Sequence, residues 1–547
     1  MILETLRSAV LAALDTAGLP APDGGVELSV PKSRDHGDWA TNVALRIARP
    51  AGRNPREVAD ELCAVLAGYP PEHVTRIEVA GPGFINFHLG PGWLHDVLRD
   101  TVAAGDALGH GSELSGERIN LEFVSANPTG PLHAGGGRWV AVGDALANVL
   151  AARGATVHRE YYLNDAGSQL DTFAESLFAR YEGAEPPENG YHGGYLVEMA
   201  AAMREELGDA VTIDRARDWG YDHVVGQLRS DLERIGVTFD TWFSERTLHE
   251  RGEVDDVLSE LTAAGVTFEA DGATWLRSTD FGDQRDRVLV RSDGTSTYLA
   301  ADFAYHRDKM RRGWSHLIDI WGADHHGQVP SIQAGMQALG AEPGQPEVIL
   351  GQLVRLERGG ETVRLSKRAG DVVTLADILD EVDPDAARLT FLLQGIDTPQ
   401  TIDLDVVTAQ SMENPVYYVQ YAHARIASIA RHAADAGVSR RPLDDVDLSP
   451  LTDERELDLL RAVFAFDEVV ADAAEHRAPY KVTNWVRDLA GRFHRFYAEC
   501  RVVTDDEALT QARLWLAAAV QIALAAGLDL LGVSAPEQMD RLDAEAS

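Results

Sequence analysis

The residues best suited to chemistry fall at two turns where a predicted strand runs into glycines. One turn ends in His133-Ala134-Gly135-Gly136 and opens a predicted helix, and the other reads Gly322-Ala323-Asp324-His325-His326-Gly327. Glycines before a helix let phosphate oxygens approach backbone N–H groups and the positive end of the helix dipole. The first turn therefore indicates a nucleotide site, and a flexible turn without a ligand is the alternative. It has neither the GxGxxG spacing of dinucleotide folds nor the GK[ST] of a P-loop.

The elements around the first turn predict a parallel βαβ unit. Ile119 to Phe123 alternates apolar and polar residues as a strand does, and apolar residues from Trp139 to Leu150 recur at helical spacing. Two prolines mark the connection between them as extended, and a second strand is expected at 157–163. Ligands of parallel sheets lie beyond the carboxyl ends of the strands. His133 falls at such an end.

The second turn is expected at the same edge of the sheet. Ser315 to Trp321 has the apolar run of a buried strand and ends at this turn, and Val348 to Val354 is predicted as a further strand. The sheet is expected to resume at Val288 to Val290 after an insertion. The Asp-His-His run in the turn could be mistaken for metal ligands, but neighbouring loop residues rarely converge on one ion without further ligands. No metal is therefore predicted here.

Two motifs of this central region resemble the signatures of a known family. Ser125 to Gly136, which reads SANPTGPLHAGG, resembles the HIGH signature of class I aminoacyl-tRNA synthetases in the extended form typical of the arginyl-tRNA synthetase family. Further along the chain, Arg364-Leu365-Ser366-Lys367 resembles the KMSK signature of the same class. Four such residues alone are more often a solvated loop than a site. Because they follow the His133 motif along the chain, as in the family, these four residues strengthen the resemblance.

The flanking regions resemble the same family. His36 to Asn42 and Ala80 to Phe87 are similar to its amino-terminal domain, which touches the D-loop of tRNA. Asn414 to Arg425 and the segment 531–537 are similar to its helical anticodon-binding domain. The resemblance thus covers all three regions in the family's order.

The resemblance implies a multidomain α/β protein. Its expected parts are an α+β amino-terminal domain over 1–115, a Rossmann-like parallel-sheet catalytic domain over 116–411, and an all-α anticodon-binding domain over 412–547. A connective insertion is expected over about 182–280 of the catalytic domain, and the KMSK-like loop over 364–367. The insertion shows no chemistry of its own.

The implied activity is that of an arginine–tRNA ligase. L-Arginine attacks the α-phosphate of ATP, pyrophosphate leaves, and the activated arginine passes to the terminal adenosine of tRNA(Arg). The family implies Mg²⁺ travelling with ATP, and a monomer. A planar cation with five donors suits recognition by carboxylates, and lysine would satisfy the same pocket poorly. Discrimination then needs no editing domain, and the sequence offers no candidate for one.

The motif positions imply roles for individual residues. The ATP-binding set, in which His133 and Lys367 are the catalytic pair, is His133, Gly135, Gly136, Gly322, Asp324, His325, Ser366 and Lys367. The arginine-binding set is Glu122, Asn127, Tyr298, Asp302 and His326. The tRNA-binding set is Phe84, Asn86, Tyr418, Tyr421 and Met539. Tyr298 and Asp302 are expected on one helix face towards the guanidinium, and which carboxylate takes which end of arginine stays open.

Two positions depart from the family signatures. Gly136 replaces the second histidine of HIGH, which removes a side-chain donor to the ATP phosphates, and Arg364 replaces the first lysine of KMSK. Both keep a site plausible and put its rate in question.

Composition bounds the rest. The 547-residue chain carries 49 Lys and Arg against 87 Asp and Glu, a formal net charge of −38. This balance argues against nucleic acid as a partner, although binding needs only a local basic surface. Cys63 and Cys500 lie far apart and form neither a disulfide framework nor a zinc CxxC pair. No apolar run is expected to reach the roughly 20 residues of a membrane span, and no signal peptide is seen. A cytoplasmic protein without membrane or structural metal is expected.

Three rival functions come from other classes. A class I synthetase for cysteine is disfavoured because its zinc-binding cysteines are missing. A non-catalytic tRNA-binding paralogue is supported by the two altered signatures and the acidity. A nucleotidyltransferase on the same fold would not need the helical carboxy-terminal domain.

Overall fold

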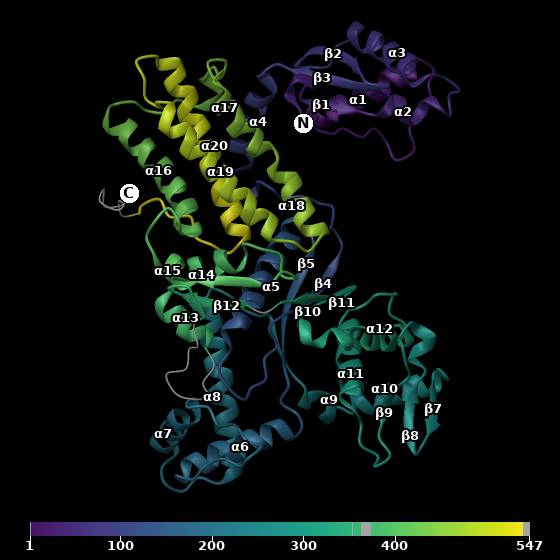
Figure 1. Cartoon of the computed structure of the whole chain (residues 1–547), viewed down its shortest axis with the longest axis vertical. Helices are drawn as coiled ribbons and strands as arrows, with labels where there is room; N and C mark the ends of the chain where they lie inside the picture. The colour runs from purple at the N-terminus through teal and green to yellow at the C-terminus, as the bar shows by residue number, and fades with distance from the viewer. Residues whose placement is uncertain (1, 353, 363–372, 540–547) are drawn as a thin grey trace. The chain divides into compact units, whose positions relative to one another are not determined.

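The computed structural model describes residues 2–352, 354–362 and 373–539 and divides the chain into two units (Figure 1). The first unit combines residues 1–105 with 429–464 and 492–522. The second unit combines residues 106–428 with 465–491 and 523–547. The carboxy-terminal helices thus contribute to both units, and the predicted active-site residues all belong to the second.

The amino-terminal part of the first unit is the α+β module that the sequence predicts. Its sheet has the order β1-β3-β2, with β3 (Phe84–Leu89) antiparallel to both β1 (Trp39–Thr41) and β2 (Val74–Ala80). Helices complete this part: α1 (Ile2–Thr16), α2 (Val43–Ala48), α3 (Pro55–Gly68) and α4 (Gly92–Ala104). Leucine and valine side chains of α1 and α3 are fully buried and form its core.

A parallel five-stranded sheet forms the centre of the second unit, and it confirms the predicted fold class. Its order is β11-β10-β4-β5-β6, and every neighbouring pair is parallel. The strands are β4 (Arg118–Glu122), β5 (Thr156–Leu163), β6 (Thr241–Ser244), β10 (His316–Gly322) and β11 (Glu347–Gly351). The predicted βαβ unit is confirmed as β4, α5 (Ala134–Ala152) and β5. From β4 the chain continues to β5 and β6 on one side of the sheet, and β10 and β11 are added on the other side. β4 and β10 therefore flank the switch point where such sheets bind ligands.

One strand prediction is wrong in its partners and another is wrong in its extent. Val288 to Val290 lies in β9 (Arg287–Val290), which pairs with β7 (Thr267–Ala270) and β8 (Ala273–Leu276) in a separate antiparallel sheet. The predicted strand Val348 to Val354 divides into β11 and β12 (Val354–Arg358), and β12 joins a third sheet with β13 (Glu361–Thr362) and β14 (Gln400–Asp403). The alternation of apolar and polar residues predicts that a segment is a strand, but the strand it pairs with depends on segments far away in the sequence.

The region predicted as the insertion contains helices and also one strand of the central sheet. Its helices are α7 (Tyr195–Leu207), α8 (Ile213–Arg234), α9 (Arg246–Glu250) and α10 (Glu253–Ala263), and α6 (Ser168–Tyr181) ends just before it. Strand β6 falls inside residues 182–280 yet pairs with β5. Helices α11 (Tyr298–Arg311) and α12 (Val329–Ala338) then pack beside the sheet.

The rest of the chain is almost wholly helical. The α-helices that follow β13 are α13 (Leu375–Glu381), α14 (Pro384–Phe391), α15 (Leu404–Thr408), α16 (Pro415–Asp435), α17 (Glu454–Phe464), α18 (Phe466–Glu475), α19 (Tyr480–Glu499) and α20 (Glu507–Leu530). Helix α20 corrects the expectation on apolar runs, because an 18-residue window of it reaches a mean hydropathy of 1.4. Since 61% of that window is buried within the protein, a core helix explains it as well as a membrane span does.

A buried arginine joins three distant elements of the second unit. Arg388 of α14 is 1% exposed, and its guanidinium donates to the Asp144 carboxylate of α5. It also donates to the backbone oxygen of Ile235, just after α8, at 2.9 Å, and to that of Leu531, just after α20, at 3.2 Å. The helix that follows His133 is thereby tied to the end of the chain's last helix.

Candidate active site

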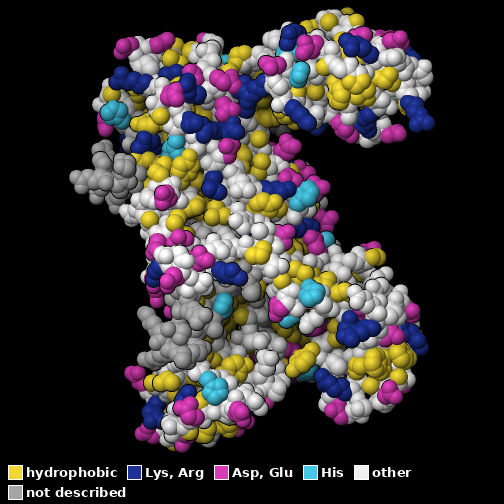
Figure 2. Space-filling model, in the orientation of Figure 1, with side chains coloured by type: hydrophobic (Ala, Val, Ile, Leu, Met, Phe, Trp, Pro, Cys, Tyr) yellow, Lys and Arg dark blue, Asp and Glu magenta, His cyan; other side chains and the backbone are white. Residues whose placement is uncertain are grey.

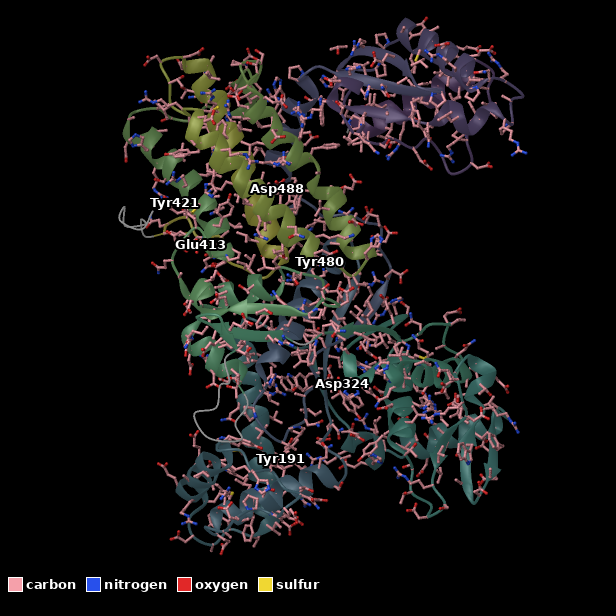
Figure 3. The ribbon with its side chains drawn as sticks, in the orientation of Figure 1. Tyr191, Asp324, Glu413, Tyr421, Tyr480 and Asp488 are labelled. Carbon is pink, nitrogen blue, oxygen red and sulfur yellow. The ribbon has the colours of Figure 1, made fainter. Side chains whose placement is uncertain are left out.

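A cavity of about 1,650 Å³ opens at the carboxyl ends of β4 and β10. It gathers ten of the predicted ATP and arginine residues from segments far apart in the chain. They are Glu122, Asn127, His133, Gly135, Gly136, Tyr298, Asp302, Gly322, Asp324 and His325. Tyr191 of the connective region and Asp324 after β10 are labelled in Figure 3, and both line this cavity.

The loop after β4 is held in an uncommon conformation. Val124 and Ser125 have positive φ angles of 72° and 41°, a region that costs a non-glycine residue about 1–3 kcal/mol. Strand β5 holds the loop there. The backbone N–H of Ala126 donates to the Tyr161 hydroxyl at 3.0 Å, and the backbone N–H of Tyr162 donates to Ser125 Oγ at 3.1 Å. The strained turn aims the Ser125 hydroxyl back at Glu122, at 2.8 Å from Oε1.

His133 is the N-cap of α5, which fixes the state of its ring. Its Nδ1 accepts the backbone N–H of Gly135 at 2.8 Å, so the proton of a neutral ring lies on Nε2. Desolvation at the cavity wall lowers the pKa of His133, which favours this neutral form. The helix start therefore presents backbone N–H groups and one ring N–H to a ligand in the cavity.

The glycine at position 136 has a packing reason. A Cβ built there would lie 2.8 Å from Cδ1 of Leu132, and at Gly137 it would lie 3.0 Å from both Leu375 and Phe391. Both glycines are buried. A histidine at 136 thus requires Leu132 to move, whereas the helix start still presents its backbone N–H groups.

The chain segment that follows the basic loop is joined to the His133 turn. The backbone N–H of Ala134 donates to the Val373 oxygen at 2.8 Å, and that of Leu375 donates to the Leu132 oxygen at 2.7 Å. His133 and Thr374 form an antiparallel bridge. Ser366 and Lys367, like Arg364, lie outside the described residues.

Two acids lie close together beside the large cavity: Asp302, which is half-buried in its lining, and the buried Glu245. Burial raises the pKa of Asp302 to about 7, the charge of His306 opposes this rise, and the charges of Glu245, Glu122 and Asp319 add to it. Glu245 is 4% exposed, and burial raises its pKa as well. Among the described residues, no Lys or Arg forms an ion pair with either carboxylate, and Glu245 faces His249, at 3.7 Å, and the Tyr162 hydroxyl. A cationic ligand would complete this end of the cavity.

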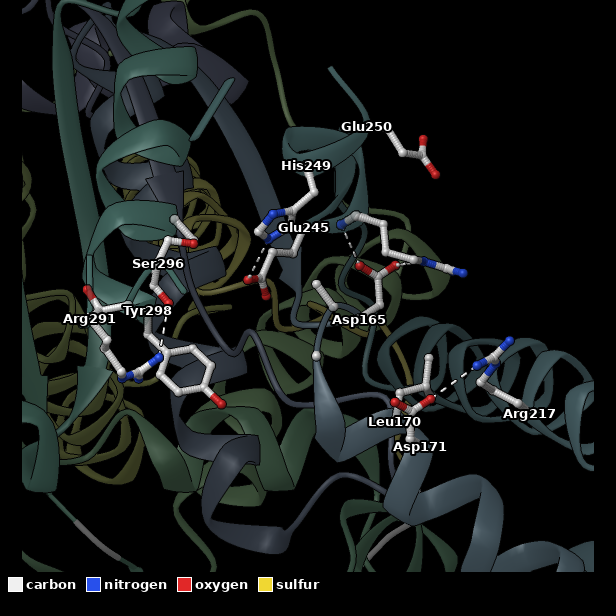
Figure 4. Close-up of a pocket in the computed structure, with 15 residues that line it drawn as sticks. Asp165, Leu170, Asp171, Arg217, Glu245, His249, Glu250, Arg291, Ser296 and Tyr298 are labelled. Carbon is white, nitrogen blue, oxygen red and sulfur yellow. Dashed lines mark hydrogen bonds and ion pairs between the residues drawn. The ribbon is translucent and has the colours of Figure 1, made fainter. Parts of the chain in front are cut away.

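A smaller cavity of about 620 Å³ adjoins this acidic end (Figure 4). Tyr298 lines both cavities, and Glu245 lines the smaller one. Asp165 at its wall is 2% exposed, and Tyr221, Ser244 and Arg246 all donate to its carboxylate. Tyr298 therefore stands between two cavities at the amino end of α11.

Two carboxylates and one imidazole lie close enough together to hold a metal ion. Ligand atoms of Glu122, His306 and Asp319 lie within 4.8 Å of one another and all three residues are buried. However, Lys309 Nζ donates to Glu122 Oε2 at 2.7 Å and to Asp319 Oδ1 at 2.9 Å. The cation of this cluster is therefore supplied by the chain.

Several predicted residues lie elsewhere. His326 is exposed and outside the cavity lining, with Nδ1 3.1 Å from the Ala323 oxygen. Of the predicted tRNA contacts, Asn86 is buried in β3 at 3% exposure, which leaves it little surface for a base, whereas Phe84 is 39% exposed.

The anticodon-side candidates lie near the end of the chain. Tyr418 and Tyr421 are half-buried on α16, and Met539 lies at the end of the described chain. Arg425 donates to the Tyr421 hydroxyl and lies over its ring, 4.6 Å from the centroid (Figure 3 labels Tyr421).

Sequence patterns missed two groups of the site. Glu245 follows the short strand β6, so it stands at the same edge as the other residues, and this position after a strand was the signal available. Lys309 gives no local signal, because its partners Glu122 and Asp319 are 187 and 10 residues away.

Comparisons with known proteins agree over the whole chain. Residues 4–89 match the family described as arginyl tRNA synthetase N terminal domain, 213–394 match tRNA synthetases class I (R), catalytic domain, and 419–539 match DALR anticodon binding domain. An arginine–tRNA ligase of Kineococcus radiotolerans is 47% identical, with 98% of each chain covered. One of Bacillus subtilis is 44% identical, covering 98% of this chain and 99% of the relative. The structure of Thermus thermophilus arginyl-tRNA synthetase matches 98% of this chain and 100% of its own with a TM-score of 0.75 at 22% identity.

Proposed function

The chain belongs to the arginyl-tRNA synthetase family and is an arginine–tRNA ligase, and on that premise we propose how its residues divide the work. The observation that carries the proposal is the acid pair Asp302 and Glu245: Asp302 lines the same large cavity as the His133 turn, and Glu245, whose charge acts on Asp302, lines the smaller cavity beside it. The carboxylate of arginine is already a nucleophile. The protein's task is to align it with the α-phosphate of ATP and to neutralise developing charge.

Arginine lies with its guanidinium at Asp302 and Glu245. The α-carboxylate must meet ATP, so the α-carbon belongs at the His133 end and the side chain points away from it. Asp302 and Glu245 carry no Lys or Arg partner among the described residues, and a planar guanidinium supplies the missing charge with two forks of donors. Glu122, which already has Lys309 as a partner, then faces the α-ammonium together with Asn127. Tyr298 borders the guanidinium end, and His326, which is exposed and outside the cavity lining, is left out.

ATP lies over the start of α5. The backbone N–H groups of Gly135 and Gly136 and the Nε2–H of His133 donate to phosphate oxygens, and the helix dipole favours the same charge. Gly322, Asp324 and His325 border the nucleotide from the end of β10. Mg²⁺ accompanies the phosphates, as it usually does with nucleotides, and not in a cage of protein ligands.

Lys367, with Ser366 beside it, neutralises the pyrophosphate as it leaves. Support comes from Val373, which is hydrogen-bonded beside His133 and only six residues along the chain.

The tRNA contacts and the setting complete the proposal. The domain division 1–115, 116–411 and 412–547 assigns the tRNA to the first and last parts, with Phe84, Tyr418, Tyr421 and Met539 as contact candidates. Figure 2 shows Lys and Arg side chains among acidic ones over the carboxy-terminal helices, which supports a local basic surface despite the charge of −38. Cys63 and Cys500 are free thiols, in keeping with a monomer that acts in the reducing cytoplasm.

Charging of tRNA by the purified protein with each of the 20 amino acids tests the whole proposal. We expect charging with arginine alone, and its collapse in Lys367→Ala, because the lysine cation is lost from the leaving pyrophosphate. Gel separation of charged and uncharged tRNA measures both. Binding of tRNA without charging by any amino acid would instead support the non-catalytic paralogue.

Arginine binding should weaken in acid. Because the pKa of Asp302 is raised to about 7, the free enzyme holds a proton on this carboxylate below that pH, and the guanidinium must displace it. We expect the KM for arginine to be flat above pH 8 and to rise about 10-fold by pH 6, where roughly a tenth of Asp302 is ionised.

Calorimetry provides a direct check of the pH effect. At pH 6.5, arginine binding should release a proton, so the apparent enthalpy should differ between buffers of different ionisation enthalpy. In Asp302→Asn this difference should disappear. A pH-independent KM in the unmodified enzyme would show that Asp302 does not meet the guanidinium.

A further inference from the structure

Lys309 is a buried ammonium beneath the amino-acid end of the cavity. It is fully buried and is one of only four lysines among the 49 basic residues of the chain. Its Nζ donates to Glu122 Oε2 at 2.7 Å and to Asp319 Oδ1 at 2.9 Å, and it lies 4.3 Å from the centroid of the Tyr305 ring. Helix α11 thus inserts one compact cation between the ends of β4 and β10.

The ammonium has a defined electrostatic task. An ion taken out of water costs several kcal/mol even after relaxation, and two carboxylates side by side repel each other. An apolar residue at 309 would leave Glu122 and Asp319 facing each other without a cation between them. Lysine is suited to the place because its three donors sit on one point and need no planar fork.

Glu122 is held at both oxygens. Oε2 accepts from Lys309, and Oε1 accepts from the Ser125 hydroxyl at 2.8 Å. The carboxylate is only 6% exposed and lines the cavity. An ionised carboxylate offers about four lone-pair positions, so about two remain for a ligand after these two bonds. The plane of Glu122 is therefore set before any ligand arrives.

Asp319 is held by a second cation. His306 Nε2 lies 2.7 Å from Asp319 Oδ2, and its Nδ1 lies 2.7 Å from the backbone oxygen of Asp302. A ring with an oxygen acceptor at each nitrogen can donate to both only as the imidazolium. Burial opposes this form, but the charge of Asp319 raises the pKa of His306 above its ordinary value. Two cations and two carboxylates then balance below the cavity.

We propose that Lys309 is a positioning residue for arginine recognition, which holds the Glu122 carboxylate oriented so that its free lone pairs receive the α-ammonium of the substrate. This role rests on the proposed function, in which Glu122 faces the α-ammonium. Lys309 itself touches no substrate. Its effect is confined to the part of the ligand that Glu122 meets, and this confinement distinguishes positioning from a general structural role.

The test compares Lys309→Met with Lys481→Met. Lys481 is the control, because it too is ion-paired, with Asp472 at 2.5 Å, but it is only partly buried and lies on α19, outside the cavity lining. Aminoacylation with tRNA present gives the KM for arginine and for ATP. Two competitive inhibitors separate the ends of arginine: agmatine, which keeps the amine and guanidinium, and 5-guanidinopentanoate, which lacks the α-ammonium.

In Lys309→Met we expect the KM for arginine and the inhibition constant of agmatine to rise about 10-fold or more, as for the loss of a charged hydrogen-bond partner. The KM for ATP and the inhibition constant of 5-guanidinopentanoate should stay within about twofold, as should every constant in Lys481→Met. Equal weakening of both inhibitors, or an unchanged KM for arginine, would overturn the proposal. Failure of the unmodified enzyme to charge arginine would instead overturn the proposed function.

Ser125→Ala keeps the proposal testable if Lys309→Met does not fold, as judged by the absence of a thermal transition. It removes the other donor to Glu122 without burying an unpaired charge. Agmatine inhibition should weaken several-fold while 5-guanidinopentanoate is unaffected. Equal behaviour of the two inhibitors in this variant would contradict the positioning of Glu122.

Discussion

His133→Ala lowers the rate of arginyl-tRNA formation by about 100- to 1,000-fold, the usual cost of losing one donor to developing charge. The ring's Nδ1 is occupied by the Gly135 N–H, so Nε2–H is the donor that the variant removes from the phosphates. The KM for arginine should change little, because in the proposed arrangement the guanidinium of arginine binds to Asp302 and Glu245 and not to His133. Steady-state aminoacylation with separate arginine and ATP titrations measures both quantities.

His133→Asn separates catalysis from folding. Alanine also removes the N-cap of α5, which typically costs about 0.5–2 kcal/mol, whereas asparagine is a good cap. The asparagine variant should therefore melt close to the unmodified protein but remain as slow as the alanine variant. Recovery of the rate with asparagine would mean that His133 acts only as a cap.

Asp302→Asn raises the KM for arginine by roughly 10- to 150-fold, which corresponds to about 1.5–3 kcal/mol for a charged hydrogen bond. The buried site has Glu245 as the remaining acid for the guanidinium, so binding is weakened and not abolished. Because the variant also removes an acid whose pKa is raised by burial, its folded state loses a desolvation cost above pH 7. We therefore expect weaker arginine binding without loss of thermal stability.

Asp308→Asn is the control for this substitution. Asp308 lies on the same helix α11 and pairs with Arg312 at 2.7 Å, outside the cavity. Its KM for arginine should match that of the unmodified enzyme. If Asp302→Asn shifted the KM for ATP and spared that for arginine, the assignment of the two cavity ends would be reversed.

The fold was predictable where the signal is local. The strand before Ser125, the proline-rich connection and the helix after His133 each show a periodicity or turn chemistry of their own, and β4, α5 and β5 follow them. The partners of β9 and β12 were not predictable, because strands with the same alternation join any of three sheets in this unit. Strand pairing is decided by burial against segments far away in the sequence.

The candidate site divides in the same way. His133, Gly135 and Asp302 belong to motifs, and the cavity brings them together. Glu245 and Lys309 belong to no motif, since one follows a four-residue strand and the other stands alone on a helix. Their importance arises from burial and from charges on other strands, which a linear sequence does not display.

The bonds of Arg388 limit how far this enzyme is modular. Its guanidinium donates hydrogen bonds to the carboxylate of Asp144, on the helix after His133, and to the backbone oxygen of Leu531, near the end of the chain. A catalytic fragment cut before the last helix would therefore keep a buried cation and lose one of its acceptors. The catalytic and carboxy-terminal domains, which are separate segments of the sequence, therefore share one buried set of hydrogen bonds and depend on each other at this point.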